Sequence, residues 1–178
     1  NTYTTNGKTK LSVVRYGNVF NSRGSVIPKF QSLKQGNKKL PITDKNMTRF
    51  FLTVDNSIKF VINCLNIMQG GEIFIPKCVS FKIMDLAKAL NKNASFKIIG
   101  LRPGEKLHEV LCPKDDAANT IEFSSFYIIK PTINFIDKRN YKKLPTREVG
   151  KTVKKDFEYT SLNNKNKILA SEIKKLIK

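Results

Sequence analysis

Two short polar stretches of this sequence combine residue types that bind phosphorylated ligands. Residues 17–24 contain two glycines, two asparagines, a serine and one arginine, Arg23. Glycine lets the backbone approach a ligand closely, amide and hydroxyl groups donate hydrogen bonds, and a guanidinium binds phosphate oxygens. This composition indicates a ligand-binding loop. A polar strand-to-helix connection in which Ser25 only caps the next helix is an equally good interpretation.

The second stretch is the turn Arg102-Pro103-Gly104-Glu105. A planar guanidinium fits a diphosphate, and a carboxylate can accept hydrogen bonds from both hydroxyls of a ribose. Arg102 and Glu105 therefore suit a nucleoside diphosphate. A local ion pair at the start of a helix is the structural alternative, and such surface pairs contribute little energy.

Two further residues could take part in chemistry but are better explained by structure. Arg49 begins an apolar run, with Asp44 and Asp55 nearby in sequence, and a structural ion pair is the favoured interpretation. His108 is the only histidine of the chain. Because it has no Cys or His partner at metal-ligand spacing, it is interpreted as a surface or packing residue. The sequence therefore predicts neither a catalytic residue nor a metal ligand.

The elements that would position these residues alternate between strands and helices. Strands are predicted at residues 11–14, 49–54, 72–76, 96–100 and 126–130, with an extended segment at 41–44. Helices are predicted after the N-caps Ser25 and Asp55, from Ser80 or its neighbours to Leu90, after the 102–105 turn, and at 171–178. This alternation predicts an α/β fold with parallel strand pairing, in which the last third of the chain wraps the same domain.

Apolar residues recur at helical spacing in these segments and indicate the faces that pack. The helix after Asp55 carries Ile58, Val61, Ile62 and Leu65 at this spacing. The residues predicted to point inward from the later helices are Leu107, Val110 and Leu111, and then Ile173, Leu176 and Ile177.

The charge of the chain raises nucleic acid as a partner. The formal net charge is +19 over 178 residues, of which 40% are hydrophobic, enough for the core of one domain. The lysines are dispersed, however, and the one dense basic run, within 138–155, falls in a segment predicted to be a loop. A lysine-rich solvated surface is therefore the favoured interpretation, and a basic nucleic-acid-binding module is the alternative.

The sequence also bears on the compartment. No apolar run approaches the length that a membrane-spanning helix needs. The chain has an odd number of cysteines, Cys64, Cys78 and Cys112, and they are not at metal-ligand spacing. This pattern indicates a reducing compartment, and the cytoplasm is predicted. The chain begins at Asn1 with a polar segment typical of a surface loop, so we expect it to be the back part of a longer protein.

Seven motifs resemble a known enzyme family. They are residues 14–19, 22–26, 41–44, 47–50, 71–77, 85–90 and 98–109. They look like the carboxyl half of the inverting UDP-N-acetylglucosamine 4,6-dehydratases, which belong to the extended short-chain dehydrogenase/reductase superfamily and feed pseudaminic acid and related polysaccharide pathways. The resemblance spans nearly the whole chain, including residues 156–164. It implies that residues 1–178 form one region of a Rossmann-like fold, with an incomplete parallel sheet interleaved with a small substrate-binding subdomain.

The resemblance implies an activity and a cofactor. In that family NADP takes a hydride from C4 of the sugar, an acid/base pair removes water across C5 and C6, and the hydride returns to C6 with inversion at C5. The residues that do this lie upstream of the matching region, and this chain has no Gly-rich fingerprint and no Tyr-x-x-x-Lys. We therefore expect a lyase whose N-terminal, NADP-binding and catalytic half is absent here, so that this fragment is inactive by itself. A homo-oligomer is compatible with this picture.

Binding residues carry over from the family position by position. Asn18 resembles a substrate-contacting residue, Val26 and Thr43 match further sugar-nucleotide contacts, and Arg102 with Glu105 matches a clamp on the diphosphate and nucleoside. The segment that resembles the NADP-lining part comprises Val19, Phe20, Asn21, Ser22 and Arg23. Asn21 replaces a usual glycine, which Asn can do because it tolerates positive φ better than most residues. Retaining dehydratase/5-epimerase relatives share parts of these motifs and are an alternative.

Overall fold

The chain forms two compact units, each assembled from interleaved segments. The computed structural model describes residues 9–20, 22, 26–35, 39–91, 95–132 and 139–177. Unit 1 comprises residues 1–16, 55–77 and 110–159, and unit 2 comprises residues 17–54, 78–109 and 160–178. The predicted helix cap Ser25 lies outside the described residues, as do Asn21 and Arg23 of the predicted cofactor segment.

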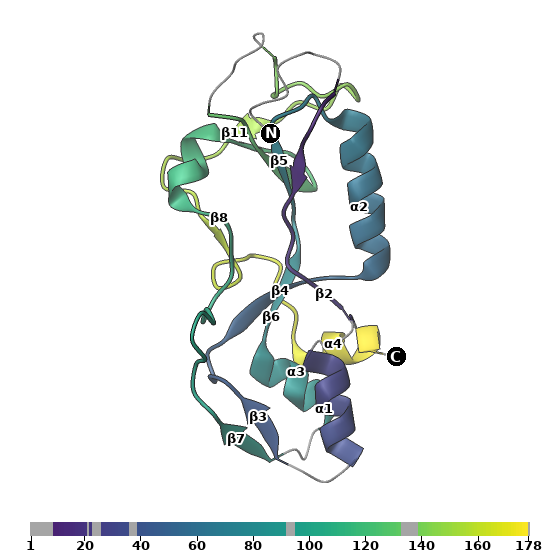
Figure 1. Cartoon of the computed structure of the whole chain (residues 1–178), viewed down its shortest axis with the longest axis vertical. Coiled ribbons are helices and arrows are strands. Elements are labelled where there is room, and N and C mark those ends of the chain that lie inside the picture. The colour runs from purple at the N-terminus through teal and green to yellow at the C-terminus, as the bar shows by residue number, and fades with distance from the viewer. Residues whose placement is uncertain are drawn as a thin grey trace. The chain divides into compact units, whose positions relative to one another are not determined.

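Unit 1 is built on a five-stranded mixed sheet (Figure 1). The strand order is β1 (Val13–Val14), β5 (Ile73–Pro76), β10 (Phe126–Ile129), β9 (Thr120–Glu122) and β11 (Lys151–Thr152). β1 and β5 pair in parallel as predicted, whereas the other three pairs are antiparallel. The sheet is therefore mixed. For the β9–β10 pair the reason is the connection of only three residues, because a parallel pair needs a long crossover.

Helix α2 (Val54–Ile67) covers unit 1 with a different face from the stripe identified in the sequence. Ser57, Cys64 and Ile67 are buried, and Cys64 and Ile67 belong to a core with Phe74 and Phe126. The residues at helical spacing, Ile58, Val61, Ile62 and Leu65, are exposed, Leu65 by 68%. Both stripes have the helical period, so periodicity alone could not choose between them.

Asp55 lies in the first turn of α2, not at its N-cap as predicted. The helix begins at Val54, two residues earlier than an N-cap at Asp55 would place its first residue. In this position the carboxylate still lies at the positive end of the helix dipole, and it forms an ion pair with Lys59 one turn later at 3.0 Å.

Unit 2 contains two small sheets. One has the order β2 (Asn18–Val19), β4 (Thr48–Leu52) and β6 (Val79–Lys82), with β2 parallel and β6 antiparallel to β4. The other pairs β3 (Leu40–Ile42) with β7 (Phe96–Ile98) in parallel. Ser80 was predicted to start a helix, but it lies in β6, fully buried opposite Phe50.

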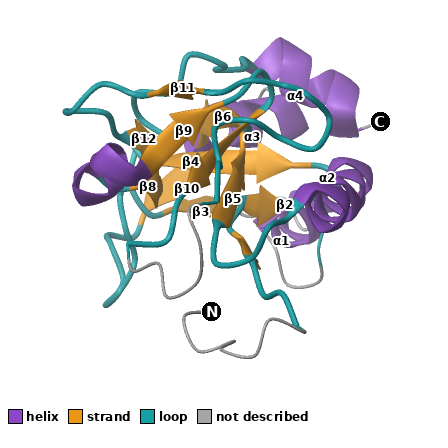
Figure 2. Ribbon diagram, turned by 90° about the horizontal axis from the view of Figure 1, so that it is seen from above, coloured by secondary structure: helices purple, strands orange, loops and turns teal. Residues whose placement is uncertain are grey.

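Three helices complete unit 2. They are α1 (Val26–Gln35), α3 (Ile83–Leu90) and α4 (Ala170–Ile177) (Figure 1). Their buried side chains contribute to a core that includes Ile27, Phe30 and Leu86. α1 and α4 lie outside the strands of unit 2, and α2 lies outside those of unit 1 (Figure 2). In α4, Ile173 is buried as predicted, whereas Leu176 is exposed. The side chain of Ile177 is outside the described residues.

Residues 101–112 contain no helix, contrary to the prediction. After the turn at 102–105 the chain runs extended into β8 (Val110–Cys112), where Val110 is exposed, and then into the 3₁₀ helix η1 (Lys114–Asn119). The backbone groups of this stretch bond to distant segments: Thr48 N–H donates to the carbonyl of Leu107 and Ser161 N–H to that of Glu109. These bonds replace the helical ones. The strand β12 (Tyr159–Thr160) marks the boundary between the units.

None of the helices in the described part of the chain could cross a membrane, since each is too short or too polar. The most extended of those named, α2, has 14 residues.

Gly17 is required where the chain enters β2. A Cβ atom at this position would overlap the Cβ of Phe50 on the neighbouring strand β4. We expect Gly17→Ala to push β2 away from β4 and to lower the free energy of unfolding by about 1–3 kcal/mol, as overpacking does. Urea unfolding followed by circular dichroism measures this. The matched control is Ser32→Ala on the exposed side of α1, expected to change stability by no more than about 0.5 kcal/mol. Equal stabilities for both variants would contradict the steric argument.

Candidate functional site

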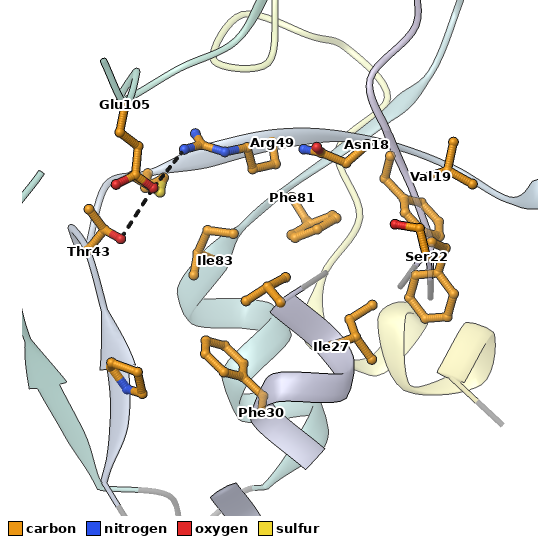
Figure 3. Close-up of a pocket in the computed structure, with 15 residues that line it drawn as sticks. Asn18, Val19, Ser22, Ile27, Phe30, Thr43, Arg49, Phe81, Ile83 and Glu105 are labelled. Atoms are coloured by element: carbon orange, nitrogen blue, oxygen red, sulfur yellow. Dashed lines mark hydrogen bonds and ion pairs between the residues drawn. The ribbon is translucent and has the colours of Figure 1, made fainter. Parts of the chain in front are cut away.

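A pocket in unit 2 brings together the loop, strands and turn that carry the predicted binding residues (Figure 3). Its volume is about 380 Å³, within the range of small-molecule sites. Its apolar surface comes from side chains of the unit 2 core, including Ile27, Phe30, Phe81 and Ile83. Its polar groups come from Asn18, Ser22, Thr43, Arg49 and Glu105. A mostly apolar cavity with a few polar groups is the usual form of a ligand site.

Each polar group is placed by a different element. Asn18 lies on β2, Thr43 directly follows β3, and Arg49 lies on β4. Glu105 lies in the turn after β7. Since β2 is parallel to β4 and β3 is parallel to β7, residues far apart in sequence meet at one cavity.

Arg49 supplies a positive charge to the pocket. Its side chain is only 14% exposed. One terminal nitrogen donates hydrogen bonds to the carbonyls of Thr48, at 2.8 Å, and Leu107, at 3.1 Å. The other lies 3.6 Å from Glu105 Oε1, and Nε lies 3.9 Å from Glu109 Oε1. The predicted structural ion pair is therefore present, but its partners are these two glutamates and not the aspartates nearby in sequence.

Glu105 faces the same cavity. Its Oε1 accepts a hydrogen bond from Thr43 Oγ1 at 3.5 Å, and its Oε2 accepts one from the backbone N–H of Arg102 at 3.3 Å. The side chain of Arg102 is exposed, and Arg102 is not among the described residues that line the pocket. The guanidinium beside Glu105 in the pocket is that of Arg49 (Figure 3).

The structure places most of the predicted site residues together. Those that line the pocket are Asn18, Val19, Phe20, Ser22, Val26, Thr43 and Glu105. Arg102 lies outside the lining, and the predicted cofactor residues Asn21 and Arg23 fall outside the described residues.

The sequence matches a family of proteins described as polysaccharide biosynthesis proteins. The match covers residues 1–131, well over half of the chain. The chain belongs to this family. The resemblance to inverting dehydratases that its motifs indicated is confirmed by the relatives it matches.

Several relatives of the chain are enzymes that act on sugar nucleotides by name. UDP-N-acetylglucosamine 4,6-dehydratase (inverting) of Campylobacter jejuni serotype O:2 is 51% identical over 161 residues, 89% of this chain and 48% of the relative. UDP-glucose 4-epimerase of Rickettsia akari is 40% identical over 179 residues, 96% of this chain and 50% of the relative.

A solved structure shares the fold. The X-ray structure of Pen from Bacillus thuringiensis superposes with a TM-score of 0.77 at 31% sequence identity, covering 94% of this chain and 49% of that one. The predicted α/β, Rossmann-like fold class is thereby confirmed. The chain spans about half the length of the relatives it matches.

Sequence reasoning assigned no role to Glu109 and Ser161, which support the pocket. Glu109 Oε1 accepts a hydrogen bond from Asn18 Nδ2 at 2.8 Å, and Oε2 accepts one from Phe50 N–H at 2.7 Å. Ser161 is fully buried, and its Oγ accepts from Glu109 N–H at 2.9 Å. The motifs at 98–109 and 156–164 pointed to the segments that contain these two residues. A single sequence, however, does not show that Glu109 and Ser161, 52 positions apart, form a hydrogen bond.

A buried hydroxyl network joins this support to His108. Thr48 Oγ1 lies 2.7 Å from Ser161 Oγ and 2.8 Å from His108 Nδ1. Thr48 and Ser161 are both buried, so their polar groups need such partners. The interpretation of His108 as a packing residue agrees with these contacts.

The three cysteines are buried and form no disulfide. Burial, the largest cause, raises the pKa of Cys64 to about 12 and that of Cys78 to about 11, because desolvation disfavours the thiolate. Burial also raises the pKa of Cys112. Since the thiolate is the nucleophile, none of these residues is suited to nucleophilic catalysis.

We therefore expect all three thiols of the folded chain to react slowly with Ellman's reagent at pH 8. At this pH a thiol with a pKa of about 11 is ionised in about one molecule in a thousand. Reactivity should rise as the pH increases towards the raised pKa values, and unfolding in urea should make all three thiols react quickly. A thiol that reacts as quickly in the folded chain as in urea would contradict this.

Proposed function

We propose that this chain is the sugar-nucleotide-binding half of an NADP-dependent, inverting UDP-N-acetylglucosamine 4,6-dehydratase that serves surface polysaccharide or pseudaminic acid biosynthesis. The observation that carries the proposal is the pocket in which Glu105, Thr43 and Arg49 lie beside an apolar surface. The relative of that name in Campylobacter jejuni, 51% identical over 89% of this chain, supports it.

The polar groups of the pocket suit the parts of a UDP-sugar. The Glu105 carboxylate would accept hydrogen bonds from the ribose hydroxyls, with Thr43 beside it. Arg49, the guanidinium in the lining, would bind the diphosphate. Arg102 lies near Glu105 on the exposed side, where we assign it an outer contact to the same diphosphate. Asn18 and Val26 would contact the sugar end.

The described part of the predicted cofactor segment fits a nicotinamide nucleotide. Val19 and Phe20 contribute apolar surface to the pocket and Ser22 contributes a hydroxyl, which suits a flat ring with polar edges. Residues 19–23 would therefore hold NADP, which supplies the hydride acceptor when bound. We assign this chain the binding and orienting of ligands and place the acid/base residues in the other half of the enzyme.

We also propose a cytoplasmic location, because three buried thiols that form no disulfide suit a reducing compartment. The remaining half of the enzyme and a second copy of the chain are the protein partners that this function implies.

Binding of UDP-N-acetylglucosamine to the 178-residue chain, measured by isothermal titration calorimetry, tests the proposal. We expect Glu105→Gln and Arg49→Gln each to weaken binding by about tenfold or more, since each removes a charged hydrogen-bonding group, worth about 1.5–3 kcal/mol. Lys142→Gln, an exposed cation of unit 1, is the control and should bind like the wild type. Thermal unfolding of each variant shows whether weaker binding reflects the loss of a ligand contact or the loss of the folded structure. A wild-type chain that does not bind this nucleotide sugar would overturn the proposed function.

The division of labour can be tested by adding the missing half. We expect the chain alone, with NADP and UDP-N-acetylglucosamine, to release no dehydrated product. A fusion in which the Campylobacter jejuni relative supplies the half that this chain does not match should restore turnover. Mass spectrometry of the sugar nucleotide, which detects loss of water, provides the measurement. Turnover by the chain alone would contradict the proposal.

A second candidate is a related epimerase or retaining dehydratase. The UDP-glucose 4-epimerase of Rickettsia akari, 40% identical over 96% of this chain, favours it. The product mass of the same fusion distinguishes the epimerase from both dehydratases, because a 4-epimerase changes the configuration of the sugar without loss of water. The configuration at C5 of a dehydrated product distinguishes the inverting from the retaining dehydratase. A product of unchanged mass and altered configuration would support the epimerase.

A further inference from the structure

The side-chain amide of Asn18 is oriented by a carboxylate that is not part of the pocket lining. Asn18 lines the pocket, and its Nδ2 donates to Glu109 Oε1 at 2.8 Å. A carboxylate can only accept hydrogen bonds. The atom that Asn18 turns towards Glu109 must therefore be the nitrogen.

This orientation determines what Asn18 offers to a ligand. Its remaining polar atom is Oδ1, which has no hydrogen-bond donor among the residues described. An amide oxygen accepts hydrogen bonds and donates none. The site therefore presents an acceptor at Asn18, which suits a hydroxyl or an amide N–H of the ligand.

Glu109 is itself held in place from three sides. Its Oε2 accepts the backbone N–H of Phe50 at 2.7 Å, and the Arg49 Nε lies 3.9 Å from its Oε1. Its own backbone N–H donates to the buried Oγ of Ser161 at 2.9 Å. Both carboxylate oxygens are therefore occupied, and the carboxylate cannot turn away from Asn18 without losing the bond to Phe50.

We propose that Glu109 is a positioning residue that sets the hydrogen-bonding polarity of Asn18, so that the pocket selects a sugar with a hydroxyl or amide N–H donor at this point. The proposal rests on the proposed function, since it takes the ligand to be a UDP-sugar.

A nearly isosteric substitution reverses this polarity. In Glu109→Gln the side chain has one acceptor atom instead of two. If that oxygen keeps the bond to Phe50 N–H, the new amide nitrogen faces Asn18. Asn18 then turns its oxygen to that nitrogen and its own nitrogen to the ligand, where a donor meets a donor.

A second substitution restores the acceptor. In the double variant Asn18→Asp with Glu109→Gln, the amide nitrogen introduced at position 109 donates to one oxygen of the aspartate, and the other oxygen faces the ligand. The net charge of the pair is the same as in the wild type. Asn18→Asp by itself instead places two carboxylates at hydrogen-bond distance, where they repel each other.

The experiment measures UDP-N-acetylglucosamine binding by calorimetry for the wild-type chain, both single variants and the double variant. We expect each single variant to weaken binding by about tenfold, a loss of the order of one charged hydrogen bond, and the double variant to recover to within about threefold of the wild type. Glu122→Gln, an ion-paired surface glutamate of unit 1, is the matched control and should bind normally.

A measurement without ligand tests the positioning role of Glu109 independently of the proposed function. The side-chain NH₂ resonances of Asn18 in ¹H–¹⁵N spectra, assigned by their loss in Asn18→Asp, should shift in Glu109→Gln and should stay in place in Glu122→Gln. Unchanged resonances in Glu109→Gln would overturn the positioning role even if no nucleotide sugar binds.

The binding outcomes are equally distinct. If the wild type binds and the double variant is no better than Glu109→Gln, Glu109 has a merely structural role and the inference fails while the proposed function stands. If the wild type does not bind but the Asn18 resonances respond to Glu109→Gln, the proposed function fails and the orientation of Asn18 stands.

Discussion

The ion pairs of Arg49 are the interaction on which the pocket depends. A guanidinium that is only 14% exposed is costly unless it is paired and hydrogen-bonded, and here two carbonyls and two carboxylates surround it. The carboxylates belong to Glu105 and Glu109, so one cation joins β4 to both ends of the segment 105–109. Loss of that cation would leave two carboxylates close together without compensation.

The same arrangement explains why the segment 105–109 is not helical. Its backbone and side-chain groups bond to Thr48, Phe50 and Ser161, which lie on other segments of unit 2. A helix would require the backbone groups for its own ladder. In the extended conformation Glu105 faces the pocket, and Glu109, four residues later in the chain, faces Asn18.

Some side chains of the unit 2 core also form part of the pocket wall. Ile27, Phe30 and Phe81 belong to the hydrophobic core of unit 2 and also line the cavity. The apolar wall of the site is therefore rigid, because displacing these side chains would disrupt the close packing of the core. The polar side chains of the pocket, by contrast, are not members of that core cluster.

The sequence by itself determined the α/β class, the family and seven of the fifteen residues that line the pocket, because strand and helix periods, turn residues and motifs are local properties. It could not show which of the two apolar stripes of α2 is buried, or that the arginine in the pocket lining is Arg49 and not Arg102. Nor could it show that Glu109 forms hydrogen bonds with Asn18 and Ser161. Those outcomes depend on which strands lie next to one another and on where each buried polar group finds its partner. Only the tertiary structure decides that, because such contacts join residues that are 52 and 91 positions apart in the chain.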